Sequence, residues 1–209
     1  MTIHVPLLSV PIDGSVKHLP YADRAEDLID TANEAVEAFM LADLDVIENF
    51  VTCDFHLLDQ TLSWIHSNHL LTGNRFCEWG AGFGVATMLA ALRGMQAVGI
   101  EIESRLVHQA EQVAATIGSS AQFYHGSFVP RGVSGLAEIS GEFKNVDTEE
   151  GDVYAEIGLE LDDFDLIFVF PWPGEEEFFE HIFAACAADG ALLLSYHGRE
   201  GMRLLRQSL

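Results

Sequence analysis

A short acidic and glycine-rich segment, residues 78–84 (Glu-Trp-Gly-Ala-Gly-Phe-Gly), carries the strongest chemical signal in this sequence. An apolar run precedes it and a helical pattern follows it, which indicates a turn from a strand into a helix. Glycines at such a turn let a ligand approach the main chain closely, at the positive end of the helix. The spacing is G-x-G-x-G, whereas a dinucleotide turn is G-x-G-x-x-G and would need glycine in place of Val85. The segment therefore predicts a ligand site, but not the usual dinucleotide one.

A second carboxylate, Glu101, ends the next apolar run, Val98 to Glu101. An acid at the end of the second strand of a strand–helix–strand unit can accept hydrogen bonds from both hydroxyls of a ribose. Glycines alone would be weak evidence, because tight turns also use them for purely structural reasons. Together with Glu78 and Glu101, they predict a site for a ribose-containing ligand.

Three residues that follow the later strands are candidate catalytic residues: Trp172, Tyr196 and His197. Open α/β sheets bind ligands outside the carboxyl ends of their strands, which is where these residues are expected. Histidine is the side chain that titrates nearest neutral pH, so His197 is the best proton acceptor by type. The alternatives are an ordinary histidine at a strand end and a tryptophan that closes the core. No metal site is expected, because His66 and His69 share a helix face but have no third ligand.

The elements that must position these residues alternate between strand and helix. Strands are expected at 75–79, 97–101, 121–125, 165–170 and 191–196, and helices at 85–93, 104–117 and 175–188. This alternation predicts a doubly wound, mainly parallel Rossmann-like sheet of five strands in the order 3-2-1-4-5. Two further helices, 23–42 and 54–71, precede it as an N-terminal extension.

The chain divides by pattern into two parts. Residues 1–72 form an arm and the helical extension, and residues 73–209 form the ligand-binding domain with an acidic insert at 127–163. Residues 199–207 are expected to be helical, which leaves the strand at 191–196 near an edge. That edge must be covered by the tail, the arm or a second subunit, so a homodimer is one possibility. The helices of the extension and the insert are expected to border the pocket near Trp172 and His197.

The two motifs resemble a known family. Residues 78–84, followed by 99–103 (Gly-Ile-Glu-Ile-Glu), look like motifs I and II of class I S-adenosylmethionine-dependent methyltransferases, and the element order from Arg75 to Tyr196 is similar. The resemblance implies S-adenosylmethionine as cofactor and S-adenosylhomocysteine as product. It implies contacts from Glu78, Gly80, Gly82 and Gly84 to the methionine end, from Glu101 to the ribose, and from Ile102, Ser127, Phe128 and Phe170 to the rest of the cofactor site.

Two features depart from the family pattern. Residues 170–173 read Phe-Pro-Trp-Pro, whereas enzymes that methylate planar nitrogens carry Asn or Asp before Pro-Pro and an aromatic residue. The usual hairpin of strands six and seven is expected to be absent, because only a short tail follows Tyr196. The alternative to an enzyme is a non-catalytic, S-adenosylmethionine-binding regulatory or interaction protein. A nicotinamide-dependent oxidoreductase is disfavoured by Val85.

Charge and cysteine content limit the partners and the compartment. The chain has 33 acidic and 10 basic residues, a net charge of −23, which predicts that it avoids nucleic acid and membranes. The predicted acceptor is a small molecule or a protein.

Cys53, Cys77 and Cys186 form no C-x-x-C pair, and the N-terminus does not read as a signal peptide. A reducing, cytoplasmic location is therefore expected.

Overall fold

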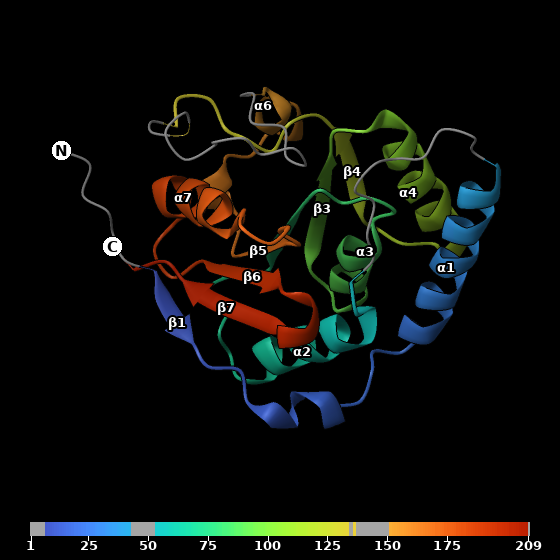
Figure 1. Cartoon of the computed structure of the whole chain (residues 1–209), viewed down its shortest axis with the longest axis horizontal. Helices are drawn as coiled ribbons and strands as arrows, with labels where there is room; N and C mark the ends of the chain where they lie inside the picture. The colour runs from blue at the N-terminus through green and yellow to red at the C-terminus, as the bar shows by residue number, and fades with distance from the viewer. Residues whose placement is uncertain (1–6, 43–52, 134–135, 137–150, 209) are drawn as a thin grey trace.

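The computed structural model describes residues 7–42, 53–133, 136 and 151–208. In these ranges a seven-stranded sheet has helices on both of its faces (Figure 1). The strands are β1 (Leu8–Val10), β2 (Arg75–Trp79), β3 (Gln96–Glu101), β4 (Gln122–His125), β5 (Leu166–Val169), β6 (Leu192–Tyr196) and β7 (Met202–Arg206). The helices are α1 (Ala25–Ala42), α2 (Phe55–Ser67), α3 (Val85–Leu92), α4 (Ser104–Ile117), α6 (Val153–Ile157) and α7 (Glu176–Cys186), with short 3-10 helices η1 (Gly14–His18), η2 (Leu161–Asp163) and η3 (Gly198–Glu200). The predicted α/β class is confirmed.

The strands are arranged in the order β1-β7-β6-β5-β2-β3-β4. The contacts between β4, β3, β2, β5 and β6 are all parallel. The carboxyl ends of these five strands therefore meet at one edge of the sheet, which is where an open α/β sheet binds its ligand.

The C-terminal segment differs from its prediction. Residues 199–207 were expected to form a helix, but Met202–Arg206 form β7, which pairs with β6 in antiparallel register, Leu194 opposite Leu204. The arm contributes β1, which pairs with β7 in turn. The sheet is thus mixed: β7 covers the edge of β6, and β1 from the arm covers the edge of β7.

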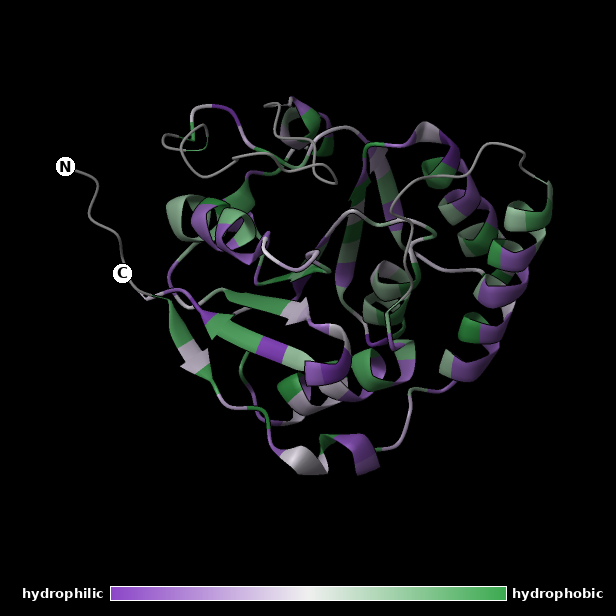
Figure 2. Ribbon diagram, viewed as in Figure 1, coloured by the Kyte–Doolittle hydropathy of each residue, from purple (hydrophilic) through white to green (hydrophobic). Residues whose placement is uncertain are grey.

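Helix formation follows the hydropathy of the chain. Figure 2 shows apolar strands between helices whose outward faces are hydrophilic. In α4 the buried positions recur at helical spacing and Gly118, in the left-handed conformation, ends the helix. Within the predicted insert the described residues form α6 and η2, and residues 134–135 and 137–150 lie outside the described part of the chain.

Two hydrophobic cores lie on opposite faces of the sheet. Phe76 and Leu204 face the core shared with α1, α2, α3 and α4, whereas their sequence neighbours Cys77 and Leu205 face the core under α6 and α7. The strands are apolar on both faces for this reason, as a sheet covered on both sides requires.

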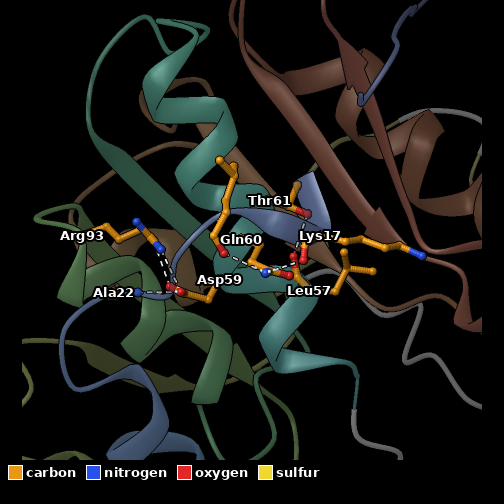
Figure 3. A network of polar contacts seen from close by, with 8 residues as sticks. Lys17, Ala22, Leu57, Asp59, Gln60, Thr61 and Arg93 are labelled. Atoms are coloured by element: carbon orange, nitrogen blue, oxygen red, sulfur yellow. Dashed lines mark hydrogen bonds and ion pairs between the residues drawn. The ribbon is translucent and has the colours of Figure 1, made fainter. Parts of the chain in front are cut away.

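Buried polar contacts join α2 to the chain around η1 and to the end of α3 (Figure 3). The fully buried Asp59 on α2 accepts two hydrogen bonds from the Arg93 guanidinium, 2.7 and 2.9 Å long, and one from the Ala22 backbone. The neighbouring Gln60 amide donates to the carbonyl oxygens of Lys17 and Leu19. Because a buried carboxylate is costly without such partners, these contacts fix α2 and the chain around η1 against the end of α3.

Candidate functional site

A cavity of about 800 Å³ opens at the carboxyl ends of β2, β3, β5 and β6. Its volume is within the range of pockets that hold small ligands and cofactors. We call two parts of it the β2–β3 half and the β5–β6 half. The β2–β3 half is lined by Glu78, Gly80, Gly82, Glu101, Ile102, Ser127 and Phe128, and the β5–β6 half by Phe170, Trp172, Glu175, Glu176, His197 and Glu200.

The turn between β2 and α3 is folded around the end of β3. The backbone N–H groups of Gly80 and Ala81 both donate to the Ile100 carbonyl, at 2.9 and 3.0 Å, and that of Gly82 donates to a Glu101 carboxylate oxygen at 2.8 Å. Gly80 and Gly82 have φ values of +74° and +54°, which other residues rarely adopt. A side chain at Gly80 would meet no atom within 4 Å, so this glycine leaves the backbone open to the cavity.

Glu101 is held in place by backbone donors. It is 8% exposed, and its second carboxylate oxygen accepts a hydrogen bond from the Glu103 N–H at 2.9 Å. Burial raises the pKa of this carboxyl, and the hydrogen bonds from Glu103 and Gly82 oppose the rise. Each carboxylate oxygen can accept a further hydrogen bond, so Glu101 retains capacity for two ligand hydroxyls.

Glu78 lies under the turn and contacts the first turn of α3. One of its carboxylate oxygens accepts hydrogen bonds from the Thr87 backbone N–H at 2.9 Å and from the Thr87 hydroxyl at 2.5 Å. Burial raises its pKa to about 8, and the nearby Glu101 adds to the rise, against the effect of the two hydrogen bonds. Glu78 is therefore mostly protonated at neutral pH in this structure.

Apolar side chains form the outer wall of the β2–β3 half. Ile102 lines the cavity with 49% of its surface exposed, and a large exposed aliphatic side chain beside a cavity suits a planar apolar ligand group. Phe128 stacks on the buried Trp79, with ring centroids 5.0 Å apart and planes inclined by 16°. The Tyr154 hydroxyl donates to the Phe128 carbonyl and accepts from the Trp79 indole. Residue 154 of the insert thus holds this wall in place.

The β5–β6 half is made of side chains from the Phe-Pro-Trp-Pro segment, α7 and the end of β6. Trp172 is 36% exposed, and its backbone N–H donates to the buried Glu175 carboxylate at 3.2 Å. Glu176 accepts a hydrogen bond from the Gly174 N–H at 2.8 Å with one oxygen, and its other oxygen lies 3.9 Å from His197 Nδ1. His197 Nε2 lies 2.7 Å from the hydroxyl of Ser195.

Of the residues predicted from the sequence, Gly84 and Tyr196 do not line the cavity. Gly84 has a φ of +73° and faces inward, where a Cβ atom would lie 2.3 Å from the Phe123 ring. It permits close packing of α3 on the sheet. The Tyr196 ring packs against Phe170, with centroids 5.0 Å apart, and so supports the wall from behind.

Several residues that the sequence did not single out also belong to the site. Val36 on α1, Phe55 at the start of α2 and Cys53 just before α2 line the cavity, so both helices of the extension border it, as expected. Burial raises the pKa of the Cys53 thiol well above its usual range, so the thiol is uncharged. The sequence did not predict a role for Ser195, because the contact of its hydroxyl with the His197 ring cannot be read from the sequence of a strand. The part of the insert at 137–150 lies outside the described residues.

Sequence comparisons give no family. No protein-family model matches this sequence, and no curated protein is similar to it.

Solved structures resemble this chain in fold. A branched-chain polyamine synthase of Thermus thermophilus, in complex with N4-aminopropylspermidine and 5'-methylthioadenosine, is 14% identical, with a TM-score of 0.54 over 86% of this chain and 44% of its own. A hypothetical protein, also of a Thermus species, is 16% identical, with a TM-score of 0.52 over 80% of this chain and 94% of its own. An RNA methyltransferase of Salinibacter ruber, in complex with S-adenosyl-L-homocysteine, is 16% identical, with a TM-score of 0.45 over 70% of this chain and 88% of its own. This chain spans about half the length, or less, of some of the proteins that it resembles.

The likeness to the two Thermus proteins is one of fold. One prediction from the sequence is wrong. A net charge of −23 was expected to exclude nucleic acid as a partner, but the solved structures that this chain is similar to include RNA methyltransferases. Net charge is an average over the whole surface, whereas an acceptor meets only the charges around one site. No helix among the described residues is long and apolar enough to cross a membrane.

The residues around the cavity fit S-adenosylmethionine in chemical type. The fixed Glu101 carboxylate suits two ribose hydroxyls, and Ile102 offers an apolar surface to the adenine. Glu78 and the open backbone at Gly80 line the same half of the cavity as Glu101. Among the described residues, no group of three His, Cys, Asp or Glu side chains is placed to hold a metal ion.

Proposed function

We propose that this protein is an S-adenosylmethionine-dependent methyltransferase. One observation carries the proposal: a single cavity joins the glycine turn and Glu101 at one end to Trp172 and His197 at the other. A transferase needs both a cofactor site and an acceptor site in one space, so that the two reacting atoms can be brought into line.

The roles of the residues follow from their positions. Gly80, Gly82 and Glu78 hold the methionine end, Glu101 the ribose, and Ile102 and Phe128 the adenine, with Ser127 and Phe170 beside them. The bound cofactor supplies a sulfonium methyl group, which is the chemistry that the protein itself lacks. The side chains of the β5–β6 half orient the acceptor and exclude water from it. Phe55 and Val36 close the cavity from the side of the N-terminal extension.

Calorimetry with S-adenosylmethionine, S-adenosylhomocysteine and NAD tests the cofactor. We expect the first two to bind and NAD to bind at least about tenfold more weakly, because the turn lacks the third glycine of a dinucleotide site. Equal binding of NAD would contradict the proposal and favour an oxidoreductase.

Turnover separates an enzyme from the non-catalytic alternative. We expect S-adenosylhomocysteine to form when the protein is incubated with S-adenosylmethionine and a broad acceptor panel. Tight cofactor binding without any turnover across that panel would indicate a regulatory or interaction protein instead.

A further inference from the structure

The imidazole of His197 is held in a defined orientation. Its Nε2 atom lies 2.7 Å from the hydroxyl of Ser195, which is only 5% exposed, and its backbone N–H donates to the Gly201 carbonyl at 2.8 Å. The buried Ser195 hydroxyl thus contacts one ring nitrogen, Nε2, from the side of the protein interior. The other nitrogen, Nδ1, is therefore the one directed toward Glu176 and the cavity.

His197 Nδ1 and Glu176 Oε1 face each other without a direct hydrogen bond. They are 3.9 Å apart, which exceeds the usual N–H···O length. In the tautomer that carries its proton on Nε2, this nitrogen donates to Ser195 Oγ and Nδ1 is left as an acceptor. Two acceptor atoms at this separation can both contact one donor nitrogen placed between them, at about 2.9 Å from each.

The charge around this pair favours a cationic donor. The β5–β6 half carries the carboxylates of Glu175, Glu176 and Glu200, and its described lining residues include neither Lys nor Arg. The rings of Phe170 and Trp172 line the same half, and aromatic faces attract cations.

We propose, on the basis of the methyl transfer proposed above, that the β5–β6 half binds a small-molecule amine between Glu176 and His197. The amine enters as an ammonium ion, and His197 Nδ1 accepts one of its protons, which frees the nitrogen lone pair. That pair forms the N–CH3 bond as the S–CH3 bond breaks, and the electrons of the S–CH3 bond stay on sulfur in a neutral thioether. The imidazolium then releases its proton to solvent. Ser195 acts as a positioning residue through His197.

Calorimetry on protein saturated with S-adenosylhomocysteine tests the proposal with three probes: 2-phenylethylamine, 2-phenylethanol and phenylacetate. We expect the amine to bind at least about tenfold more tightly than the alcohol or the acid, because only it can donate charge-assisted hydrogen bonds. Glu176→Gln should weaken amine binding at least about fivefold and leave the affinity for S-adenosylhomocysteine unchanged. Glu177→Gln is the matched control, since Glu177 is the next residue on α7, exposed and outside the cavity lining.

The outcomes separate this proposal from the one on which it rests. If S-adenosylhomocysteine does not bind the wild-type protein, the proposed function fails. If it binds but the amine gives no heat at millimolar concentration, or binds no better than the alcohol, the amine proposal is overturned. The same holds if Glu176→Gln weakens S-adenosylhomocysteine binding and spares the amine, because the carboxylate would then serve the cofactor.

The role of Ser195 has its own readout. Nitrogen-15 NMR of the His197 imidazole should show the proton on Nε2 in the wild-type protein and in Ser195→Thr, and a mixture of tautomers in Ser195→Ala. An unchanged tautomer in Ser195→Ala would show that Ser195 only packs against the ring.

Discussion

The two halves of the cavity are built from different kinds of chemical group. The polar groups of the β2–β3 half are backbone N–H groups and carboxylates that are already fixed by hydrogen bonds, as at Gly82 and Glu101. The β5–β6 half consists of side chains, of which Trp172, Glu176 and His197 reach the cavity from one loop, one helix and one strand end. Because backbone geometry is set by the fold, the first half suits a constant ligand. The second half can change with single substitutions, which is what a site for a variable acceptor needs.

The largest expected effect tests the rigidity of the β2–β3 half. Gly84→Ala should lower the free energy of unfolding by roughly 2–5 kcal/mol. The new methyl group would clash with the Phe123 ring, and alanine is strained in the left-handed backbone conformation that Gly84 adopts. Gly174→Ala is the control from the acceptor-side loop, where φ is +95° and a Cβ meets no atom within 4 Å, so only strain of about 1–2 kcal/mol is expected. Urea unfolding measures both variants. Equal losses of unfolding free energy would mean that the two turns tolerate a side chain equally well. The difference in rigidity between the two halves would then not exist.

Glu101→Ala should separate the two halves in binding. The variant loses two hydrogen bonds to a charged group, so we expect affinity for S-adenosylhomocysteine to fall at least about tenfold while the circular dichroism spectrum is kept. Glu111→Ala on the outer face of α4 is the control and should bind as the wild type does. Unchanged affinity in a folded Glu101→Ala protein would remove the assignment of the ribose site.

Glu78 should link cofactor binding to proton release. Its pKa of about 8 is lowered when a positively charged amino group is bound nearby, so at pH 7 binding should release up to about one proton. Calorimetry of S-adenosylhomocysteine in two buffers of different ionisation enthalpy measures this number. Glu78→Gln should abolish the release, and a wild-type value of zero would place the amino group elsewhere.

The same carboxyl makes stability depend on pH. Its pKa in the folded protein is above the free value of 4.5, so its protonated form stabilises the folded state. The contribution is complete below pH 4.5 and is lost as the pH rises toward about 8. Urea unfolding at several pH values should show a decline that is weaker in Glu78→Gln. Identical profiles for the two proteins would show that other groups cause the decline.

The smallest expected effect lies in the β5–β6 half. Trp172→Ala removes a side chain that is 36% exposed. The free energy of unfolding should therefore change by less than about 1 kcal/mol. Affinity for S-adenosylhomocysteine should change by less than about threefold, whereas acceptor turnover should fall. A large loss of S-adenosylhomocysteine affinity would assign Trp172 to the cofactor and break the division into halves.

The sequence predicts the β2–β3 half well because its signals are local. The glycine spacing, the acid that ends β3 and the helical period of residues 104–117 all lie within short stretches, and α4 begins and ends where that period does. Residues 199–207 were misread because Leu204 and Leu205 are buried in opposite cores, so the segment lacks the alternation that marks a strand. Pairing with β6 decides its structure, and that pairing is a tertiary contact. The Ser195–His197–Glu176 arrangement escaped prediction for the same reason, since α7 and β6 meet only in three dimensions.

The pairing of Leu8 with Arg206 has a consequence for how the protein is made. A ribosome adds roughly 5–20 residues per second, so β1 waits on the order of 10–40 seconds before its partner strand exists. Strand β6 is made only shortly before β7, so β1 is the strand that waits without its partner. A contact of such high sequence separation also closes a large loop, which slows refolding from denaturant. Strand β1 can therefore pair only after every other described strand has been made.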